Sequence, residues 1–472
     1  MRKYIQRLII CVCLPFMLNS VVLGQTLEPL FVGGMMQQTV EGVWHNKSKG
    51  WTLELSGSTF TLYDDSDAGC LKSPMTSEEI AALLRYFGWH NDQLMLSFRD
   101  DASTIYYFQK MDTVPAACFQ DAASSPKAVF DYFWGVMQAH YAFFDLYGVD
   151  WEKRRQAFEA RIRPDLTDTE LFDVLSEMMA GLLDGHLTLE AEIDGEGRRF
   201  SPTRTRRLGP SLDEDYKKQR KIKNLGEFHT RWYRNTMKAV RKTVLNKRGQ
   251  GSLADESIVW GKIGDVGYIK ILWMEGYAES ESFSMEAEIN GAHKVISKVI
   301  TELADTKTLI VDVAFNRGGL DEVSLAIASH FAKEHVPAYS KVSYKAAVEP
   351  QQIFVHPANT VQYLKPVALF TSEITASAGE SFTMAMRALP NVTHYGDATF
   401  GALSDILPKP LPNGWGLSLS NEIYEDMDGQ VWEGRGVEPD EKMIVFDPGN
   451  LNKSYLEALV KLARKLEDLH TN

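Results

Sequence analysis

Cysteine and long apolar segments are the two features that this sequence has least of. Only four of the 472 residues are cysteine, and Cys11 and Cys13 both fall within the first 24 residues. Beyond residue 24 no stretch approaches the roughly 20 apolar residues that a membrane-spanning helix needs. We therefore expect no stable membrane insertion. The chain also contains no internal repeat.

Several familiar signatures are missing as well. There is no His-Glu-x-x-His segment, which argues against a metalloprotease, and no Gly-x-Ser-x-Gly elbow, which argues against an ordinary lipase or esterase. The net charge of −13 argues against nucleic acid as the main partner, because phosphate backbones attract positive charge. A length of 472 residues with 44% hydrophobic content is enough for two or three domains.

The first 24 residues are typical of a secretory signal peptide. Three basic residues precede the short apolar run Leu8–Leu18, and small residues follow near Gly24. We therefore predict an exported protein, periplasmic or extracellular. A lipid anchor at Cys11 ranks second, because the bulky Ile10 before it fits poorly with the small-residue cleavage sites of export signals.

Removal of this leader leaves two cysteines, Cys70 and Cys118, which flank one small segment. In an oxidising compartment such a pair is expected to form a disulfide. The alternative is two buried free thiols.

The order of patterns along the chain predicts five parts. Short alternating runs separated by turn residues indicate strands, apolar stripes at helical spacing indicate a helical region, a run rich in Lys and Arg follows, and strands then alternate with helices. The predicted parts are a signal peptide at 1–24, a small β-sheet or barrel at 30–122, a helical cap at 125–195, a basic and partly helical connector at 196–255, and an α/β domain at 256–472.

Ser377 lies at the junction between a predicted strand and a predicted helix. The strand is the short apolar run Val367–Phe370, and apolar residues recur at helical spacing over Ser381–Leu389. At a helix N-terminus the first N–H groups have no partner within the helix, so negative charge on a nearby oxygen is stabilised. Ser377 is therefore a candidate acyl-transfer nucleophile. The alternative is a serine that merely caps the helix.

Donors for an oxyanion are predicted in two places. The loop Asn316–Gly319 directly follows a buried strand, and its Gly318 and Gly319 permit a close backbone approach. The N–H of Ala378 would complete the pair. The alternative for this loop is an ordinary glycine-rich turn between a strand and a helix.

His186 is the candidate general base. It is the histidine, among eleven, that lies at a glycine-flanked junction between a predicted helix and an alternating strand. The other histidines are assigned structural roles by default.

Five motifs occur in a fixed order, at Leu183–His186, Leu309–Gly319, Thr375–Glu380, Thr399–Gly401 and Glu433–Asp440. Together they resemble the motifs of the C-terminal processing, or tail-specific, serine peptidase family. The resemblance covers about residues 127–440. It implies an α/β, Clp-protease/crotonase-like catalytic domain, endopeptidase or tail-trimming activity, and no metal or cofactor.

Two subgroups of this family differ in the general base. In the Ser–Lys subgroup a lysine follows the Thr-Phe-Gly motif, but here that position is Ala402, which cannot accept a proton. The other subgroup resembles the tricorn core and uses a histidine from the cap with a downstream glutamate. His186 and Glu433 stand at the matching positions, so the resemblance implies a catalytic set of Ser377, His186 and Glu433.

One position departs from the tricorn-like pattern. The residue before the histidine is a serine in that pattern and Gly185 here. Three arrangements stay open at this point: Glu433 reaches His186 directly, it acts through water, or Asp184 or Thr188 takes the place of the serine.

The connector shows neither the short strands nor the glycine loop of a peptide-binding PDZ module, so we predict that this module is absent. The predicted partner is then a peptide or unfolded protein held by the catalytic domain itself. The competing hypothesis is a non-catalytic protein that binds peptides or apolar ligands, as retinoid-binding relatives with this fold do. The sequence does not determine the oligomeric state.

Overall fold

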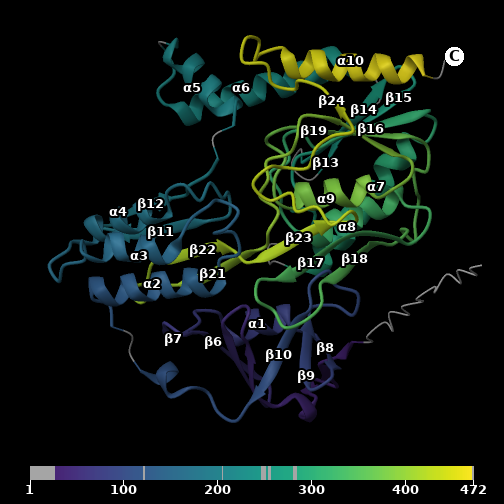
Figure 1. Cartoon of the computed structure of the whole chain (residues 1–472). Coiled ribbons are helices and arrows are strands. Elements are labelled where there is room, and N and C mark those ends of the chain that lie inside the picture. Colours follow the sequence, from purple (N-terminus) through teal and green to yellow (C-terminus); the bar gives the residue numbers. More distant parts are fainter. Residues whose placement is uncertain are drawn as a thin grey trace, which may run out of the picture.

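The computed structural model describes residues 27–120, 123–204, 206–219, 221–245, 251–253, 257–279 and 284–469. The predicted signal peptide at 1–24 lies outside these residues. Among the helices described, none combines the length and apolar character required to cross a bilayer. Figure 1 shows a small β module, a cap and a larger core.

The N-terminal β module is one antiparallel sheet of eight strands in the order β1-β8-β9-β10-β4-β5-β6-β7. Because β1 and β7 are edge strands, the module is an open sheet and not a barrel. A capping box of Thr76 and Glu79 begins its helix α1 (Ser77–Leu83). The strands are β1 (Glu28–Pro29), β4 (Gly42–Asn46), β5 (Trp51–Ser56), β6 (Thr59–Ser66), β7 (Gly69–Lys72), β8 (Tyr86–His90), β9 (Gln93–Ser97) and β10 (Tyr106–Met111), with the small hairpin β2 (Phe31–Val32) and β3 (Met35–Met36) beside them.

The cap combines three helices with a four-stranded sheet. The helices are α2 (Pro126–His140), α3 (Trp151–Glu159) and α4 (Asp168–Met179), and the strand order is β12-β11-β22-β21. Two of these strands, β11 (Thr188–Ile193) and β12 (Glu196–Phe200), follow the helices in sequence. The other two, β21 (Ile406–Pro410) and β22 (Gly416–Ser420), come from the second half of the chain. The cap is therefore built from two distant segments.

The core contains a seven-stranded sheet in the order β13-β14-β15-β16-β19-β20-β24. Strands β15 to β24 pair in parallel, and β13 to β15 pair antiparallel. The strands are β13 (Gly251–Leu253), β14 (Ile258–Ile263), β15 (Val266–Ile271), β16 (Thr308–Asp312), β19 (Val367–Thr371), β20 (Val392–Gly396) and β24 (Glu441–Lys442).

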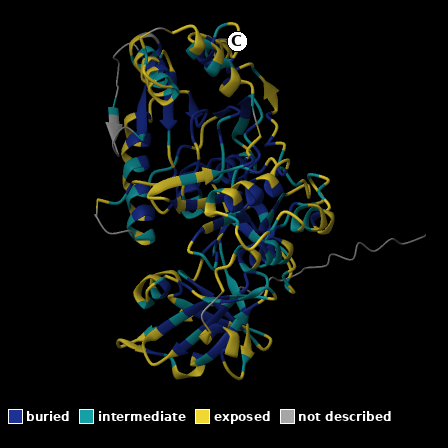
Figure 2. Ribbon diagram, turned by 90° about the vertical axis from the view of Figure 1, so that its left-hand side faces the viewer, coloured by how far each residue is buried: buried dark blue, intermediate teal, exposed yellow. Residues whose placement is uncertain are grey.

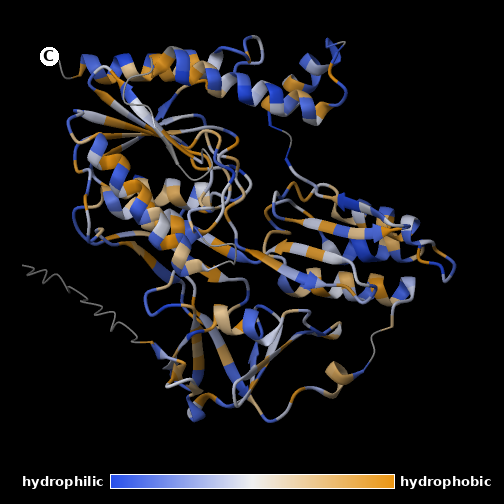
Figure 3. Ribbon diagram, turned by 180° about the vertical axis from the view of Figure 1, so that it is seen from behind, coloured by the Kyte–Doolittle hydropathy of each residue, from blue (hydrophilic) through white to orange (hydrophobic). Residues whose placement is uncertain are grey.

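Helices cover both faces of this sheet. Leu309 and Val311 of β16 pack toward α7 (Met285–Glu302), α8 (Asp321–Ala328) and α9 (Ala378–Arg387), whereas Ile310 packs toward α10 (Ser454–Asp468) on the other face. The connector supplies α5 (Leu208–Lys217) and α6 (Leu225–Ala239), which lie beside α10 in Figure 1. Figure 2 shows the strands buried between these layers, and Figure 3 shows apolar and polar residues alternating along α10.

A further sheet, of three strands, lies between the core helices and the β module (Figure 1). Its order is β18-β17-β23, with β17 (Val336–Ser343), β18 (Gln351–Val355) and β23 (Glu422–Asp426). The predicted fold class, an α/β catalytic domain with a helical cap and a separate small β domain, is confirmed. The sequence patterns did not predict that residues 406–420 would extend into the cap.

Candidate active site

Ser377 stands at the turn between β19 and α9, as predicted. Its backbone has φ 55° and ψ −130°, in the left-handed region that residues other than glycine seldom adopt. The residue occupies the N-cap position, but its side chain makes no capping hydrogen bond, so the capping interpretation does not account for it. Strained backbones of this kind persist where the surrounding structure enforces them. The hydroxyl is left at a half-buried surface, available for chemistry.

The loop after β16 approaches Ser377 closely. Gly318 has φ 110°, and a Cβ atom there would lie 2.5 Å from the Cβ of Ser377 and 3.1 Å from its Oγ. Only glycine fits this contact. The N–H of Gly318 donates to Oδ1 of Asn316 at 2.8 Å, however, so it is already occupied. Within the described part of the chain, the N–H groups of Gly319 and Ala378 make no hydrogen bond, which leaves these two as the candidate oxyanion donors.

His186 lies just before β11 and is half-buried. Its Nδ1 is 2.6 Å from the carbonyl oxygen of Ser404. Because a carbonyl only accepts hydrogen bonds, Nδ1 carries the proton and Nε2 of the neutral ring is left as a base. Burial lowers the pKa of His186, and the opposing effects of Asp184, the Ser404 carbonyl and Asp321 are smaller. The ring is therefore neutral near pH 7.

One short segment, Thr399–Asp405, joins the serine and the histidine. The N–H of Ser377 donates to the carbonyl oxygen of Ala402 at 2.8 Å, and His186 donates to the carbonyl of Ser404, two residues further on. Residues two apart in a chain lie at most about 7 Å from each other. The structure thus brings together two residues that lie almost two hundred positions apart in the sequence.

Glu433 holds this segment and does not hydrogen bond to His186. Its Oε2 accepts from the backbone N–H groups of Leu403 and Ser404, at 2.9 and 3.0 Å. The side chain is only 3% exposed. Burial, followed by the charges of Asp184 and Glu380, raises its pKa well above the ordinary value. Glu433 therefore positions the carbonyl that orients the imidazole.

The two proposed substitutes for the missing serine do not contact the imidazole either. Asp184 Oδ1 accepts from the backbone N–H of His186 at 2.8 Å and from the hydroxyl of Ser420 at 3.1 Å. Thr188 lies in β11 opposite Ser418. The group that directly orients the ring is a backbone carbonyl, which sequence patterns cannot identify.

Gly185 has a packing explanation. A Cβ atom at this position would lie 2.7 Å from Cε1 of Phe400 and 3.1 Å from the Cβ of Ala402. A serine would therefore collide with the aromatic ring. The ring of Phe400 occupies the space that a side chain at position 185 would need, so this position has to be glycine.

Two further residues support the site. Asn316 is fully buried, and its amide Nδ2 donates to the carbonyl of Ile271 at 3.3 Å while its Oδ1 holds Gly318. Glu380, one turn after Ser377, accepts from Thr399 Oγ1 at 2.5 Å and from the N–H groups of Gly401 and Ala402 at 2.7 Å. Burial raises the pKa of Glu380 to about 7. Both residues lie within the sequence motifs, but nothing in the sequence distinguished their supporting roles from those of the other motif residues.

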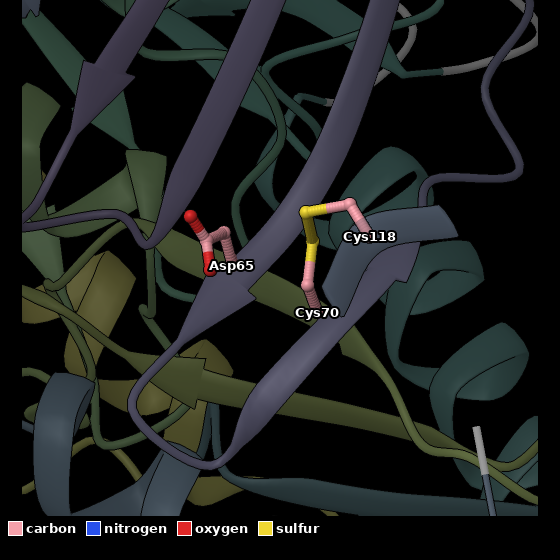
Figure 4. A group of neighbouring side chains, drawn as sticks. All are labelled: Asp65, Cys70 and Cys118. Atoms are coloured by element: carbon pink, nitrogen blue, oxygen red, sulfur yellow. A yellow bond between two sulfur atoms is a disulfide. The ribbon is translucent and has the colours of Figure 1, made fainter. Parts of the chain in front are cut away.

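The predicted cysteine pair lies in the β module, away from this site. Cys70 of β7 and Cys118 form a disulfide, with Asp65 beside them (Figure 4). Among the described residues these three are the group of acidic, histidine or cysteine side chains close enough to hold a metal ion. The disulfide removes both thiolates, and Asp65 accepts a hydrogen bond from Thr52, so the group does not suit a metal.

Two family models match the chain. Residues 265–443 match peptidase family S41, and residues 123–180 match the C1 domain of tricorn protease. Residues 265–443 are therefore similar to an S41 peptidase domain. The first match includes Ser377, the oxyanion loop and Glu433, and the second includes the cap helices. The predicted relationship to C-terminal processing peptidases with a tricorn-like core is confirmed, as is the assignment to the serine-type peptidases.

One curated protein and two solved structures are also similar to this chain. A Staphylococcus saprophyticus protein named as a probable CtpA-like serine protease is 25% identical over 190 residues, which make up 40% of this chain and 35% of that protein. A candidate peptidase from Parabacteroides merdae superposes with a TM-score of 0.55 at 24% identity, over 72% of this chain and 97% of that one. Mature CPAF in complex with lactacystin superposes with a TM-score of 0.51 at 14% identity, over 73% and 98%. The two structures establish the fold alone.

Proposed function

We propose that this protein is an exported serine endopeptidase or tail-trimming peptidase that acts through an acyl-enzyme. The observation that carries the proposal is the shared segment: Ser377 and His186 are bound to carbonyls two residues apart, beside free N–H donors. The S41 match over residues 265–443 supports the peptidase class.

The first half of the reaction follows from this geometry. Ser377 Oγ attacks the carbonyl carbon of the scissile peptide bond while its proton passes to Nε2 of His186. The N–H groups of Gly319 and Ala378 donate to the oxyanion that forms. His186 then gives the proton to the leaving amine nitrogen as the C–N bond breaks, and the acyl group remains on Ser377.

Hydrolysis of the acyl-enzyme repeats these steps with water as the nucleophile. His186 takes a proton from water, the resulting oxygen attacks the ester carbon, and the proton returns to Ser377 Oγ as the carboxylic acid product leaves. The carbonyl of Ser404 keeps Nδ1 protonated throughout, and Glu433 and Glu380 hold the segment that carries this carbonyl. In our proposal Glu433 orients His186 indirectly, by holding the backbone of Ser404, whose carbonyl accepts from the imidazole.

The substrate class is extended or unfolded polypeptide. The described part of residues 198–245 contains the end of β12, then α5, α6 and a short π-helical turn joined by loops, and its residues after Phe200 form no strand (Figure 1). Substrate is therefore held by the core and cap themselves. Export is supported by the leader pattern and by the Cys70–Cys118 disulfide, since disulfides persist in oxidising compartments.

The test is cleavage of a peptide library followed by mass spectrometry of the products. The parent protein should generate new termini, and Ser377→Ala should generate none above the uncatalysed background while its circular dichroism and unfolding temperature stay unchanged. Loss of a triad serine lowers kcat by on the order of 10⁴-fold or more. Cleavage that persists in Ser377→Ala would remove the assignment of the nucleophile. A folded parent that cleaves nothing would favour the binding-protein hypothesis.

A further inference from the structure

The β module is joined to the core by buried charged groups. Lys341 of β17 is 3% exposed, and its Nζ donates to Oγ1 of Thr104 in the β module at 2.7 Å. The same Nζ donates to Oδ2 of Asp405 at 3.0 Å and forms an ion pair with Glu422 at 3.3 Å. A buried ammonium needs this number of partners to offset its lost hydration. Lys341 therefore ties the β module to two segments of the core at one point.

One short series of contacts connects Lys341 to His186. Asp405 directly follows Ser404, whose carbonyl accepts from His186 and whose Oγ accepts from the N–H of Glu422. The segment that orients the imidazole is thus held on one side by Glu433 and on the other by Lys341 and Glu422. A shift of Asp405 would move the Ser404 carbonyl with it.

A second route leads from Lys341 to the serine helix. Its Nζ donates to the hydroxyl of Tyr424 at 3.2 Å, and that hydroxyl donates to Oδ2 of Asp321 at 2.9 Å. Oδ1 of Asp321 accepts from Ser381 in the first turn of α9 at 2.6 Å. Ser381 follows Ser377 by four residues, so the network reaches both halves of the site.

Two further buried lysines join the β module to the rest of the chain. Lys49 of the module donates to Oε1 of Glu422 at 2.6 Å and so contacts the same carboxylate as Lys341. Lys409 has other partners. Lys409 is 2% exposed and pairs with Asp64 at 2.9 Å, and it also donates to the carbonyl of Gly50. These partners lie in the β module and do not touch the segment that holds His186. Lys409 therefore serves as a matched comparison: it is a buried lysine that also joins the β module to the rest of the chain, but its ammonium has one carboxylate partner and makes no hydrogen bond or ion pair with residues 399–405.

We propose that Lys341 is a positioning residue of the active site, and that the β module, through Thr104, is part of the apparatus that orients His186 and the first turn of α9. This inference rests on the proposed function, because it assigns the module to the peptidase site. The module is then a permanent component of the site and not a detachable substrate-presenting domain.

The first experiment compares Lys341→Met with Lys409→Met in peptide hydrolysis. Lys409→Met leaves the buried carboxylate of Asp64 without its cation, and Lys341→Met leaves Asp405 without its cation and Glu422 with Lys49 alone, so both variants should lose stability. Lys341→Met should lower kcat by about 10- to 100-fold with KM unchanged, since small misplacements of catalytic groups have effects of this size. Lys409→Met should leave kcat unchanged below its unfolding temperature. Lys341→Arg, which keeps the charge, should recover part of kcat.

A milder variant isolates the contribution of the β module. Thr104→Val removes only the hydroxyl that accepts from Lys341 and should lower kcat by about two- to tenfold, the effect of one hydrogen bond. It also tests the proposal if Lys341→Met fails to fold. Equal losses of kcat in Lys341→Met and Lys409→Met, or full activity in Thr104→Val, would overturn the proposal.

A spectroscopic readout separates this inference from the proposed function. The Nδ1 proton of His186, held at a short distance from a carbonyl, should give a downfield proton resonance that is absent from His186→Asn. Lys341→Met should shift or broaden this resonance, and Lys409→Met should leave it in place. An unmoved resonance contradicts the positioning role even in an active enzyme. If the parent cleaves no peptide, the proposed function fails while this measurement still reports on Lys341.

Discussion

The serine and histidine halves of the site are built in different ways. The serine half comes from β16 and β19, adjacent parallel strands in which Val311 lies opposite Leu369, and from the turns that directly follow them. The histidine half needs β11 from the cap, Ser404 just before β21, and Glu433 beyond β23. The first half depends on neighbouring elements of one sheet, and the second depends on contacts between segments more than two hundred residues apart.

The two halves also differ in how their residues are held in place. The serine half contains one strained backbone, at Ser377, and one position that only glycine can occupy, at Gly318, because the two residues pack closely together. The histidine half depends on two buried carboxylates, Glu380 and Glu433. They accept hydrogen bonds from N–H and hydroxyl groups of the segment Thr399–Asp405 and so hold it in place. Changes in the serine half should therefore remove the chemistry directly, whereas changes in the histidine half should act through the position of Thr399–Asp405.

The largest expected effect in the histidine half comes from His186→Ala. Without the base, kcat should fall by on the order of 10⁴-fold or more, as in other serine hydrolases. The parent's kcat/KM should rise with pH through a value below 6.5, because the pKa of His186 is lowered and the neutral ring is the active form. Stopped assays between pH 4 and 9 measure both. A parent profile with its acid limb above pH 6.5 would contradict the neutral, buried imidazole.

An intermediate effect is expected from Gly185→Ser, which restores the residue of the tricorn-like pattern. The new side chain collides with Phe400, so kcat/KM should fall by about 10- to 100-fold as the segment moves. Adding Phe400→Ala should recover part of the loss, and a double-mutant cycle measures this coupling. Gly197→Ser is the control, because a Cβ atom there meets nothing within 4 Å. A fully active Gly185→Ser would show that the glycine is not required by packing.

The smallest effect is a change in the pH dependence of stability at Glu380. Its pKa is raised from 4.5 to about 7 in the folded protein, so the folded state binds more protons than the unfolded state between these values. The free energy of unfolding should therefore fall as pH rises from about 4.5 to about 7, by about 2–3 kcal/mol from this group. Glu380→Gln should remove this slope, measured by urea denaturation at several pH values. The exposed Glu28→Gln should keep the slope, and an unchanged slope in Glu380→Gln would assign it to other groups.

The same contrast decides how much the sequence can predict. Apolar periodicity and the Thr375–Glu380 motif located the turn at Ser377, because strand, turn and helix are consecutive in the chain. The position of His186 between a helix and a strand was also predicted, and the structure places it between α4 and β11. The carbonyl of Ser404, the pairing of β11 with β22, and the route from Lys341 to Asp405 could not be found, because backbone atoms and long-range register leave no pattern in residue types. For the same reason the sequence could not predict that Glu433 accepts from main-chain N–H groups and not from His186.

We propose that His186 activates Ser377, with the segment Thr399–Asp405 holding the two residues together. The most direct test is to treat the folded protein with a fluorophosphonate probe and locate the adduct by tandem mass spectrometry, in the parent and in His186→Ala. We expect a single adduct on Ser377 in the parent and loss of this adduct in His186→Ala. A folded parent that remains unlabelled at Ser377, or labelling that is undiminished without His186, would contradict it.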